Sequence, residues 1–111
     1  MTEMHAVLER QLTALATGDI EAVMENYATD AALIRFDGVF AGTERIRATL
    51  SAYLSLQPQL VKLLQYAEHS DTLVYRAVMN VGGQAKDAMG MMVLRDGKIW
   101  RQTAGFFDAD H

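Results

Sequence analysis

Apolar residues recur at helical spacing in the first part of the chain. Between residues 2 and 17 one apolar stripe predicts a helix, formed by Met4, Leu8, Leu12 and Leu15. Thr2 is its expected N-cap and Gly18 the residue that ends it. Asp19 is expected to cap a second, shorter helix, whose apolar positions are Ile20, Val23, Met24 and Tyr27.

A short strand and a third helix follow. Residues 28–30 are expected to break the second helix, residues 31–36 to form the strand, and Asp37-Gly38 to make a turn. Thr43 is the expected cap of the third helix, whose stripe consists of Ile46, Leu50, Tyr53 and Leu54. The helix should end at Gln57, because proline disfavours helical geometry in the residue before it.

After Pro58 the pattern changes to the alternation of β-strands. Strands are predicted over residues 60–68, 73–81, 84–95 and 98–107, and residues 108–111 are expected to form a frayed tail. The turn signals are Gly82-Gly83 and Asp96-Gly97. Helices followed by a meander of strands predict an α+β domain, in which a curved, mostly antiparallel sheet wraps around three helices and leaves a pocket between them.

Composition limits the classes of function. The 111 residues form one domain, 50% hydrophobic, with 10 basic and 14 acidic residues. A net charge of −4 without a basic run argues against binding to nucleic acid or to an anionic membrane. No signal peptide or membrane-spanning run is recognisable, so a cytoplasmic protein is expected. Cysteine is absent and His5, His69 and His111 lack metal-ligand spacing, so no metal or other cofactor is expected.

Three segments of the chain carry a family resemblance. They are GDIEAVMENYATDAAL from Gly18 to Leu33, GVFAGTERIRATL from Gly38 to Leu50, and VLRDGKIWRQTAGFFD from Val93 to Asp108. The chain resembles the nuclear transport factor 2-like superfamily, in its branch of polyketide cyclase-like (SnoaL-like) proteins and ketosteroid isomerases. The resemblance implies a cone-shaped α+β barrel with an internal pocket and a homodimer formed through the outer face of the sheet. It leaves the reaction open, because one fold hosts many functions.

The catalytic groups of the ketosteroid isomerases are not present at the matching positions. Their aspartate base corresponds to Arg35, and their two oxyanion donors, a tyrosine and a protonated aspartate, correspond to Gln11 and Gly90. Steroid isomerisation in that form is therefore not expected. The nearest acid is Asp37, two residues from Arg35 and on the same face of an extended segment.

Arg35 and Asp37 are the candidate catalytic pair. If their face lines the pocket, Arg35 would keep Asp37 ionised and orient a carbonyl or anionic ligand, and Asp37 would act as a general base. The alternative is an ion pair at the rim of the pocket, half in solvent and of little energetic consequence.

The candidate ligand-binding residues are Gln11, Tyr53, Tyr75, Met92, Trp100, Gln102 and Phe106. The resemblance places Trp100, Gln102, Ala104 and Phe106 on the inner face of the last strand. For Gln102 the alternative is a buried structural amide, and for Gln11 it is a solvated helix edge. The two tyrosines are interpreted either as ligand contacts or as core residues.

An apolar stripe on the other face of the strands is the candidate dimer interface, formed by Val74, Val78, Met89, Met91 and Val93. A covering helix or loop is the alternative. Two functions remain open. The first is binding of a small, mostly apolar, cyclic or aromatic metabolite, with or without cofactor-free acid–base catalysis of the isomerase, cyclase or hydratase/hydrolase type. The second is a non-catalytic dimeric binding or interaction module.

Overall fold

The computed structural model describes residues 4–107 and contains three helices and six strands in that range. In chain order they are α1 Ala6–Thr17, α2 Ile20–Glu25, β1 Tyr27–Arg35, β2 Gly38–Ala41, α3 Thr43–Leu54, β3 Gln59–His69, β4 Thr72–Val81, β5 Gln84–Arg95 and β6 Lys98–Phe107. The helices precede the long strands, as the order of the hydrophobic patterns predicted. The tail predicted at residues 108–111 lies outside the described residues.

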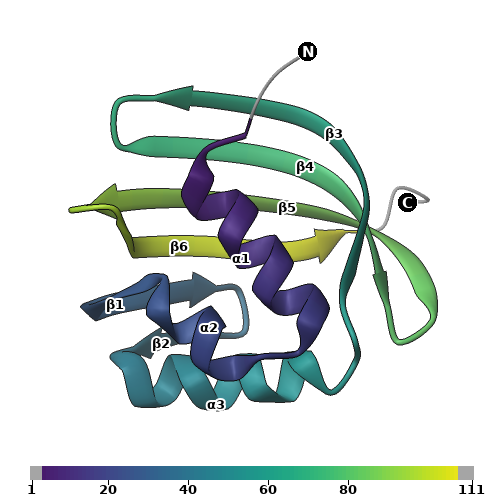
Figure 1. Cartoon of the computed structure of the whole chain (residues 1–111), viewed down its shortest axis with the longest axis horizontal. Helices are drawn as coiled ribbons and strands as arrows, with labels where there is room; N and C mark the ends of the chain where they lie inside the picture. Colours follow the sequence, from purple (N-terminus) through teal and green to yellow (C-terminus); the bar gives the residue numbers. More distant parts are fainter. Residues whose placement is uncertain (1–3, 108–111) are drawn as a thin grey trace.

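The six strands form one curled sheet that does not close. The strand order is β2-β1-β6-β5-β4-β3, with every neighbouring pair antiparallel except β1 and β6, which run parallel. Figure 1 shows α1 crossing one face of this sheet and α3 lying beside β1 and β2, while β3 and β4 bend around the helices. The predicted α+β fold, with three helices in a curved, mostly antiparallel sheet, is confirmed.

The sequence predicted some of the helix caps correctly and others wrongly. Gly18 ends α1 with a left-handed φ of 73°, and the Asp19 carboxylate accepts hydrogen bonds from the backbone N–H groups of Glu21 and Ala22 in the first turn of α2. Two predicted caps were wrong. The start of α1 is capped by His5, whose Nδ1 accepts from the backbone N–H of Val7. In α3, Thr43 is the first helical residue and Gly42 is the N-cap.

The segment around Tyr27 differs most from its prediction. Tyr27 was expected on the buried face of α2, and residues 28–30 as a break, but the strand β1 already begins at Tyr27. The next strand, β2, was not predicted, and it pairs with β1 after a connection of two residues, Phe36 and Asp37. Gly38, which was expected in the turn, is a strand residue opposite Arg35. The pairing of β1 with β6 is irregular after Tyr27, and the Tyr27 side chain is buried in the core.

The main core lies between the helices and the concave face of the sheet. Its largest fully buried residues include Leu8, Val23, Ile46, Leu73, Met92 and Ile99. The alternation predicted for residues 73–81 is confirmed, since the side chains of Leu73, Ala77, Met79 and Val81 are buried. The sheet therefore presents one apolar face inward, and the helices cover only part of it.

A β-bulge in β6 changes which residues face inward. Leu94 pairs with Ile99 and Val93 with Arg101, so Trp100 is an extra residue without a partner on β5. Ile99 and Gln102 consequently both point into the molecule, and Trp100 does not. The prediction that Trp100 shares the inner face with Gln102 was wrong, because strict alternation is broken at this bulge.

Candidate functional site

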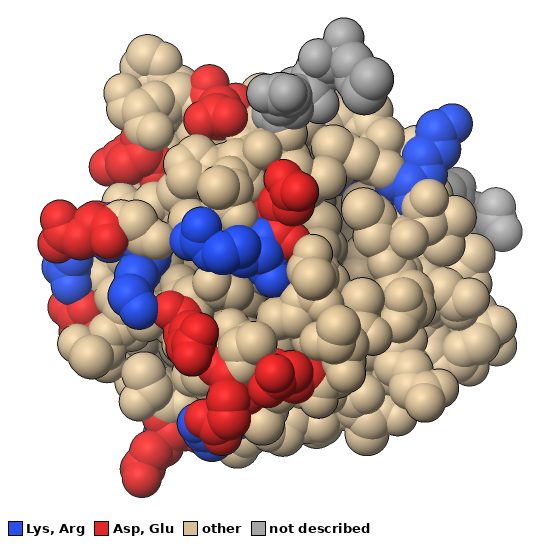
Figure 2. Space-filling model, in the orientation of Figure 1, with Lys and Arg blue, Asp and Glu red and all other residues tan. Residues whose placement is uncertain are grey.

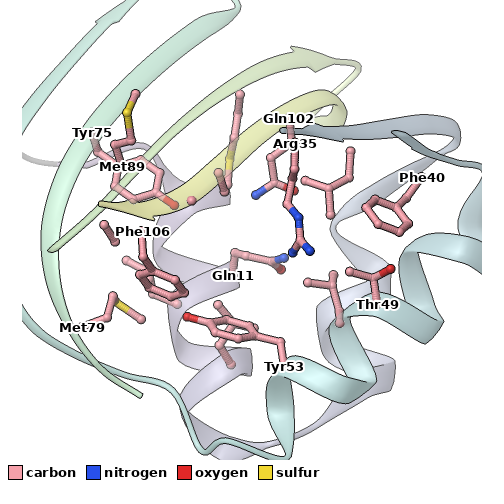
Figure 3. A pocket seen from close by; sticks show the side chains of 18 of the residues that line it. Gln11, Arg35, Phe40, Thr49, Tyr53, Tyr75, Met79, Met89, Gln102 and Phe106 are labelled. Carbon is pink, nitrogen blue, oxygen red and sulfur yellow. The ribbon is translucent and has the colours of Figure 1, made fainter. Parts of the chain in front are cut away.

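A cavity of about 720 Å³ lies between α1, α3 and the concave face of the sheet. Its walls are mostly apolar, and Figure 3 shows side chains from both helices and from the sheet converging on it. The apolar lining includes Leu8, Leu12 and Leu15 of α1, Leu50 of α3, and Leu33, Met79 and Met92 of the sheet. This size and lining suit a small, mostly apolar molecule.

The exposure of the lining residues distinguishes the floor of the cavity from its mouth. On the floor, Gln11, Tyr27 and Met92 are each at most 3% exposed. The mouth consists of exposed lining residues from the β1–β2 connection, the end of α3 and the middle of the sheet, namely Phe36, Asp37, Leu56, Met89 and Phe106. The cavity is therefore open to solvent on the side of these residues and buried at its floor.

Buried polar side chains form a continuous chain of hydrogen bonds across the floor. Asn26 Nδ2 donates to Gln11 Oε1 at 2.8 Å, and Gln11 Nε2 donates to the Tyr27 hydroxyl at 3.1 Å. The Tyr27 hydroxyl in turn donates to Gln102 Oε1 at 2.5 Å. Arg10, on the exposed side of α1, begins the chain, because its Nε donates to Asn26 Oδ1 at 3.4 Å. Asn26 and Gln11 thereby use both the oxygen and the nitrogen of their amides, and Gln102 uses only its oxygen.

Several polar groups remain open to the cavity after these bonds are counted. The Gln102 Nε2 group has no hydrogen-bond partner among residues 4–107, although its Oε1 accepts from Tyr27. The hydroxyls of Tyr53 and Tyr75 likewise have no partner in the described part of the chain, and both residues line the cavity. The cavity therefore offers a few unpaired polar groups among apolar walls, the arrangement that orients a bound small molecule.

These tyrosines stay neutral at physiological pH. Burial raises the pKa of Tyr75 to about 12. Burial, followed by the influence of Tyr75, raises the pKa of Tyr53 to about 12. The pKa of Tyr27 is raised still further, chiefly by burial and then by Tyr75. All three hydroxyls can therefore donate hydrogen bonds across the whole neutral range.

Gly90 makes room for Tyr75. A Cβ at position 90 would lie 2.6 Å from both Cζ and the hydroxyl oxygen of Tyr75, which is closer than real contacts allow. The Tyr75 hydroxyl thus occupies the space that a side chain at position 90 would fill. Gly90 therefore allows the Tyr75 side chain to lie against β5, where its hydroxyl lines the cavity.

Arg35 and Asp37 form a bidentate ion pair at the mouth. Arg35 Nε and Nη2 donate to the two carboxylate oxygens of Asp37 at 2.9 and 2.7 Å. The side chains are 32% and 64% exposed. Arg35 also lies over the ring of Phe40, with its guanidinium carbon 5.2 Å from the ring centre, and Figure 3 shows its end pointing into the cavity.

The ion pair with Arg35 lowers the basicity of Asp37. Hydrogen bonds from Arg35 are the main cause that holds the pKa of Asp37 below its usual value of 3.8, which makes this carboxylate a weak base. Arg35 Nη1 has no partner in the described range and remains available to a ligand oxygen. Such a half-exposed ion pair at the rim of the pocket is the alternative to a catalytic pair that was expected from the sequence.

The structure brings most of the candidate ligand-binding residues together. Those that line the cavity are Gln11, Tyr53, Tyr75, Met92, Gln102 and Phe106. Gln11 is buried and bonded rather than on a solvated helix edge. Trp100 lies outside the cavity lining, where Arg101 and Arg95 stack on its ring at 3.9 and 4.8 Å.

Sequence reasoning missed Tyr27 and Asn26. Tyr27 was placed on the buried face of the second helix and Asn26 was given no role, and neither the hydrophobic pattern nor the spacing shows that both meet Gln11 of α1. Met89, expected on the outer face, also lines the mouth at a position paired with Gly105.

Charge and clustering offer no competing site in the described residues. Within residues 4–107 no group of three or more His, Cys, Asp and Glu side chains is placed to hold a metal ion. Figure 2 shows acidic and basic side chains interleaved toward one end of the face with the helices, and few charges toward the other end. None of the helices in that range is long and apolar enough to cross a membrane.

The curled sheet, the three helices and the cavity between them define a nuclear transport factor 2-like α+β cone. A model of the SnoaL-like domain matches residues 8–102, and the chain belongs to this family. No match was found among functionally curated proteins.

Solved structures share the fold at low sequence identity. A nuclear transport factor 2-like protein from Cytophaga hutchinsonii is 18% identical, with a TM-score of 0.77 over 96% of this chain and 93% of that one. A protein from Sinorhizobium meliloti, provisionally assigned as a polyketide cyclase, is 18% identical, with a TM-score of 0.79 over 92% and 95%. One from Kribbella flavida, provisionally assigned as a ketosteroid isomerase, is 14% identical, with a TM-score of 0.82 over 96% and 78%. At these identities the likeness shows the fold alone.

Proposed function

We propose that this protein binds a small, mostly apolar, cyclic or aromatic metabolite that carries a hydrogen-bond acceptor such as a carbonyl oxygen. The observation that supports this proposal is the combination of a cavity of about 720 Å³ with donors that protein groups leave unpaired. Apolar walls supply affinity, and the donors of Gln102, Tyr53 and Tyr75 supply orientation.

The proposal is tested by thermal-shift screening of neutral aromatic and terpenoid compounds with and without a carbonyl group. A ligand at 100 times its dissociation constant stabilises the folded state by about 2.7 kcal/mol. Ala104→Trp, which fills the cavity from a lining position on β6, is the control. Ketones should raise the melting temperature of the wild type and not of the variant. If no ketone stabilises the wild type, or if the variant responds equally, the proposal fails.

Cofactor-free acid–base catalysis is the second candidate, and it would use Arg35 and Asp37, which both line the cavity at its mouth. Arg35 would stabilise negative charge on a ligand oxygen, and Asp37 would take a proton as an isomerase, cyclase or hydratase/hydrolase requires. The low pKa and the exposure of Asp37 favour the role of Arg35 over that of Asp37. Asp37→Asn should abolish any turnover without unfolding the protein, and full activity in this variant would remove Asp37 from the mechanism.

A homodimer through the outer face of the sheet is proposed as the assembly. Val74, Met89 and Met91 are 39%, 45% and 40% exposed on neighbouring strands β4 and β5. A second copy of this chain would cover this apolar stripe, which a monomer leaves in water. The same dimer without turnover would be the non-catalytic binding module.

A further inference from the structure

The hydrogen-bond chain on the cavity floor has a direction, and one surface residue determines it. We propose that Arg10 fixes the orientation of every amide in the chain, so that Gln102 presents its NH₂ group to the cavity and the site selects ligands that accept a hydrogen bond. This inference rests on the proposed function, because it specifies the chemistry of the ligand at that same cavity.

The direction of the chain depends on what each group can donate or accept. A guanidinium only donates, so Asn26 must turn its oxygen toward Arg10 Nε. Its NH₂ group then faces Gln11, which must turn its own oxygen toward Asn26. The Gln11 NH₂ group consequently donates to the Tyr27 hydroxyl.

The last step leaves a donor in the cavity. Because the Tyr27 oxygen already accepts from Gln11, its single proton is directed to Gln102 Oε1. The Gln102 NH₂ group remains, and it has no partner among residues 4–107. Gln11, Asn26 and Gln102 are 3%, 6% and 9% exposed, so water does not readily substitute for a chain member and relax the order.

Arg10 acts as a positioning residue and does not touch the ligand. Its bond to Asn26 is long, at 3.4 Å, so its role is to choose the orientation rather than to hold the chain together. The shorter bonds further along transmit that choice. The other polar groups of the cavity do not oppose it, since the hydroxyls of Tyr53 and Tyr75 can donate or accept.

By the same rules of donating and accepting, Arg10→Glu should reverse the direction of every hydrogen bond in the chain. A glutamate oxygen is as many bonds from Cα as arginine Nε, and a carboxylate only accepts. Asn26 would turn its NH₂ group outward, Gln11 would follow, and the Tyr27 hydroxyl would donate to Gln11. Gln102 would then donate to Tyr27 and present its carbonyl oxygen to the cavity. A remote surface substitution would thereby convert a site for acceptors into one for donors.

The experiment compares two bicyclic probes by calorimetry or NMR titration. They are 1-indanone, which only accepts hydrogen bonds, and indole, which only donates one. The wild type should prefer 1-indanone, and Arg10→Glu should lower the ratio of the two affinities by roughly tenfold, as expected for gaining one bond and losing another. Arg10→Lys, which keeps a donor-only group, should retain the preference of the wild type.

Arg45→Glu is the matched control. Arg45 is exposed on α3 and outside the cavity lining, and its replacement changes the net charge as Arg10→Glu does. An equal ratio in the two glutamate variants would overturn the role of Arg10. Failure of both probes to bind the wild type would instead count against the proposed function.

Neutron diffraction from perdeuterated crystals tests the direction without a ligand. In the wild type the Gln102 oxygen should face Tyr27, and in Arg10→Glu the Gln102 ND₂ group should face it. The same orientation in both proteins would overturn the inference whatever the probes do.

Discussion

The close approach of Tyr75 to Gly90 makes Gly90→Ala the most informative single substitution. A Cβ at this position would meet Cζ and the hydroxyl oxygen of Tyr75 at 2.6 Å and Cε1 at 2.7 Å. Each of these distances is well inside van der Waals contact, so the ring must move into the cavity or the strands must separate. Overpacking of this kind costs about 1–3 kcal/mol.

Gly105→Ala is the matched control, because it makes the same chemical change elsewhere on the cavity wall. A Cβ at Gly105 would meet no heavy atom within 4 Å, and its φ does not require glycine. Stability should therefore stay the same or rise by about 0.4–1 kcal/mol through the lower entropy of the unfolded chain. In a domain of about this size, 1 kcal/mol corresponds to roughly 4 °C or more in melting temperature.

Substitutions of Tyr75 identify the cause of the stability loss in Gly90→Ala. Tyr75→Leu removes the ring atoms that clash, so the double variant with Gly90→Ala should lose less stability than the sum of the two single changes. Tyr75→Phe keeps Cζ at 2.6 Å from the new methyl group and should give little relief. Calorimetry or urea unfolding measures these differences. Equal melting temperatures for Gly90→Ala and Gly105→Ala would refute the packing argument.

Three further predictions concern the floor, the tyrosines and the outer face. Tyr27→Phe leaves Gln11 Nε2 and Gln102 Oε1 without their partner and should cost about 1–3 kcal/mol in urea unfolding, whereas an unchanged midpoint would show that the chain is not stabilising. Tyr75 has a folded-state pKa of about 12 against an ordinary 10, so its stabilising contribution is complete below pH 10 and is lost as pH rises through 12. The NMR signal of the Tyr75 ring should thus report ionisation only together with unfolding, and its titration near pH 10 in folded protein would contradict the burial. Met91→Glu should convert the proposed dimer into a monomer in analytical ultracentrifugation, and a monomeric wild type would remove that interface.

The fold was accessible from sequence because its signals are local. Helical stripes, the Gly18-Asp19 junction and the alternation over residues 73–81 each report the geometry of a single element. Tyr27 was misassigned since its spacing also fits the preceding helix, and only pairing with Ile99 of β6 shows that it belongs to a strand. Tertiary pairing overrode the local pattern there.

The candidate site was only partly accessible. Alternation groups Gln102 with Ala104 and Phe106, and the family resemblance placed that face inward. The bulge at Trp100 shifts the phase by one residue, and nothing in the sequence around it marks that bulge. The partners of Gln11 come from residues 15 and 16 positions away, and the chain continues to Gln102. Such contacts depend on packing of elements distant in sequence, which a one-dimensional pattern does not contain.

The central claim is that the cavity binds a small apolar molecule through an oxygen held near Gln102. Titration of isotope-labelled wild-type protein with 1-indanone, followed by NMR, tests it most directly. The account predicts saturable shifts at the side-chain amide of Gln102 and at Tyr75, with no saturable response in Ala104→Trp. It would be contradicted by the absence of saturable shifts, or by shifts confined to residues outside the cavity.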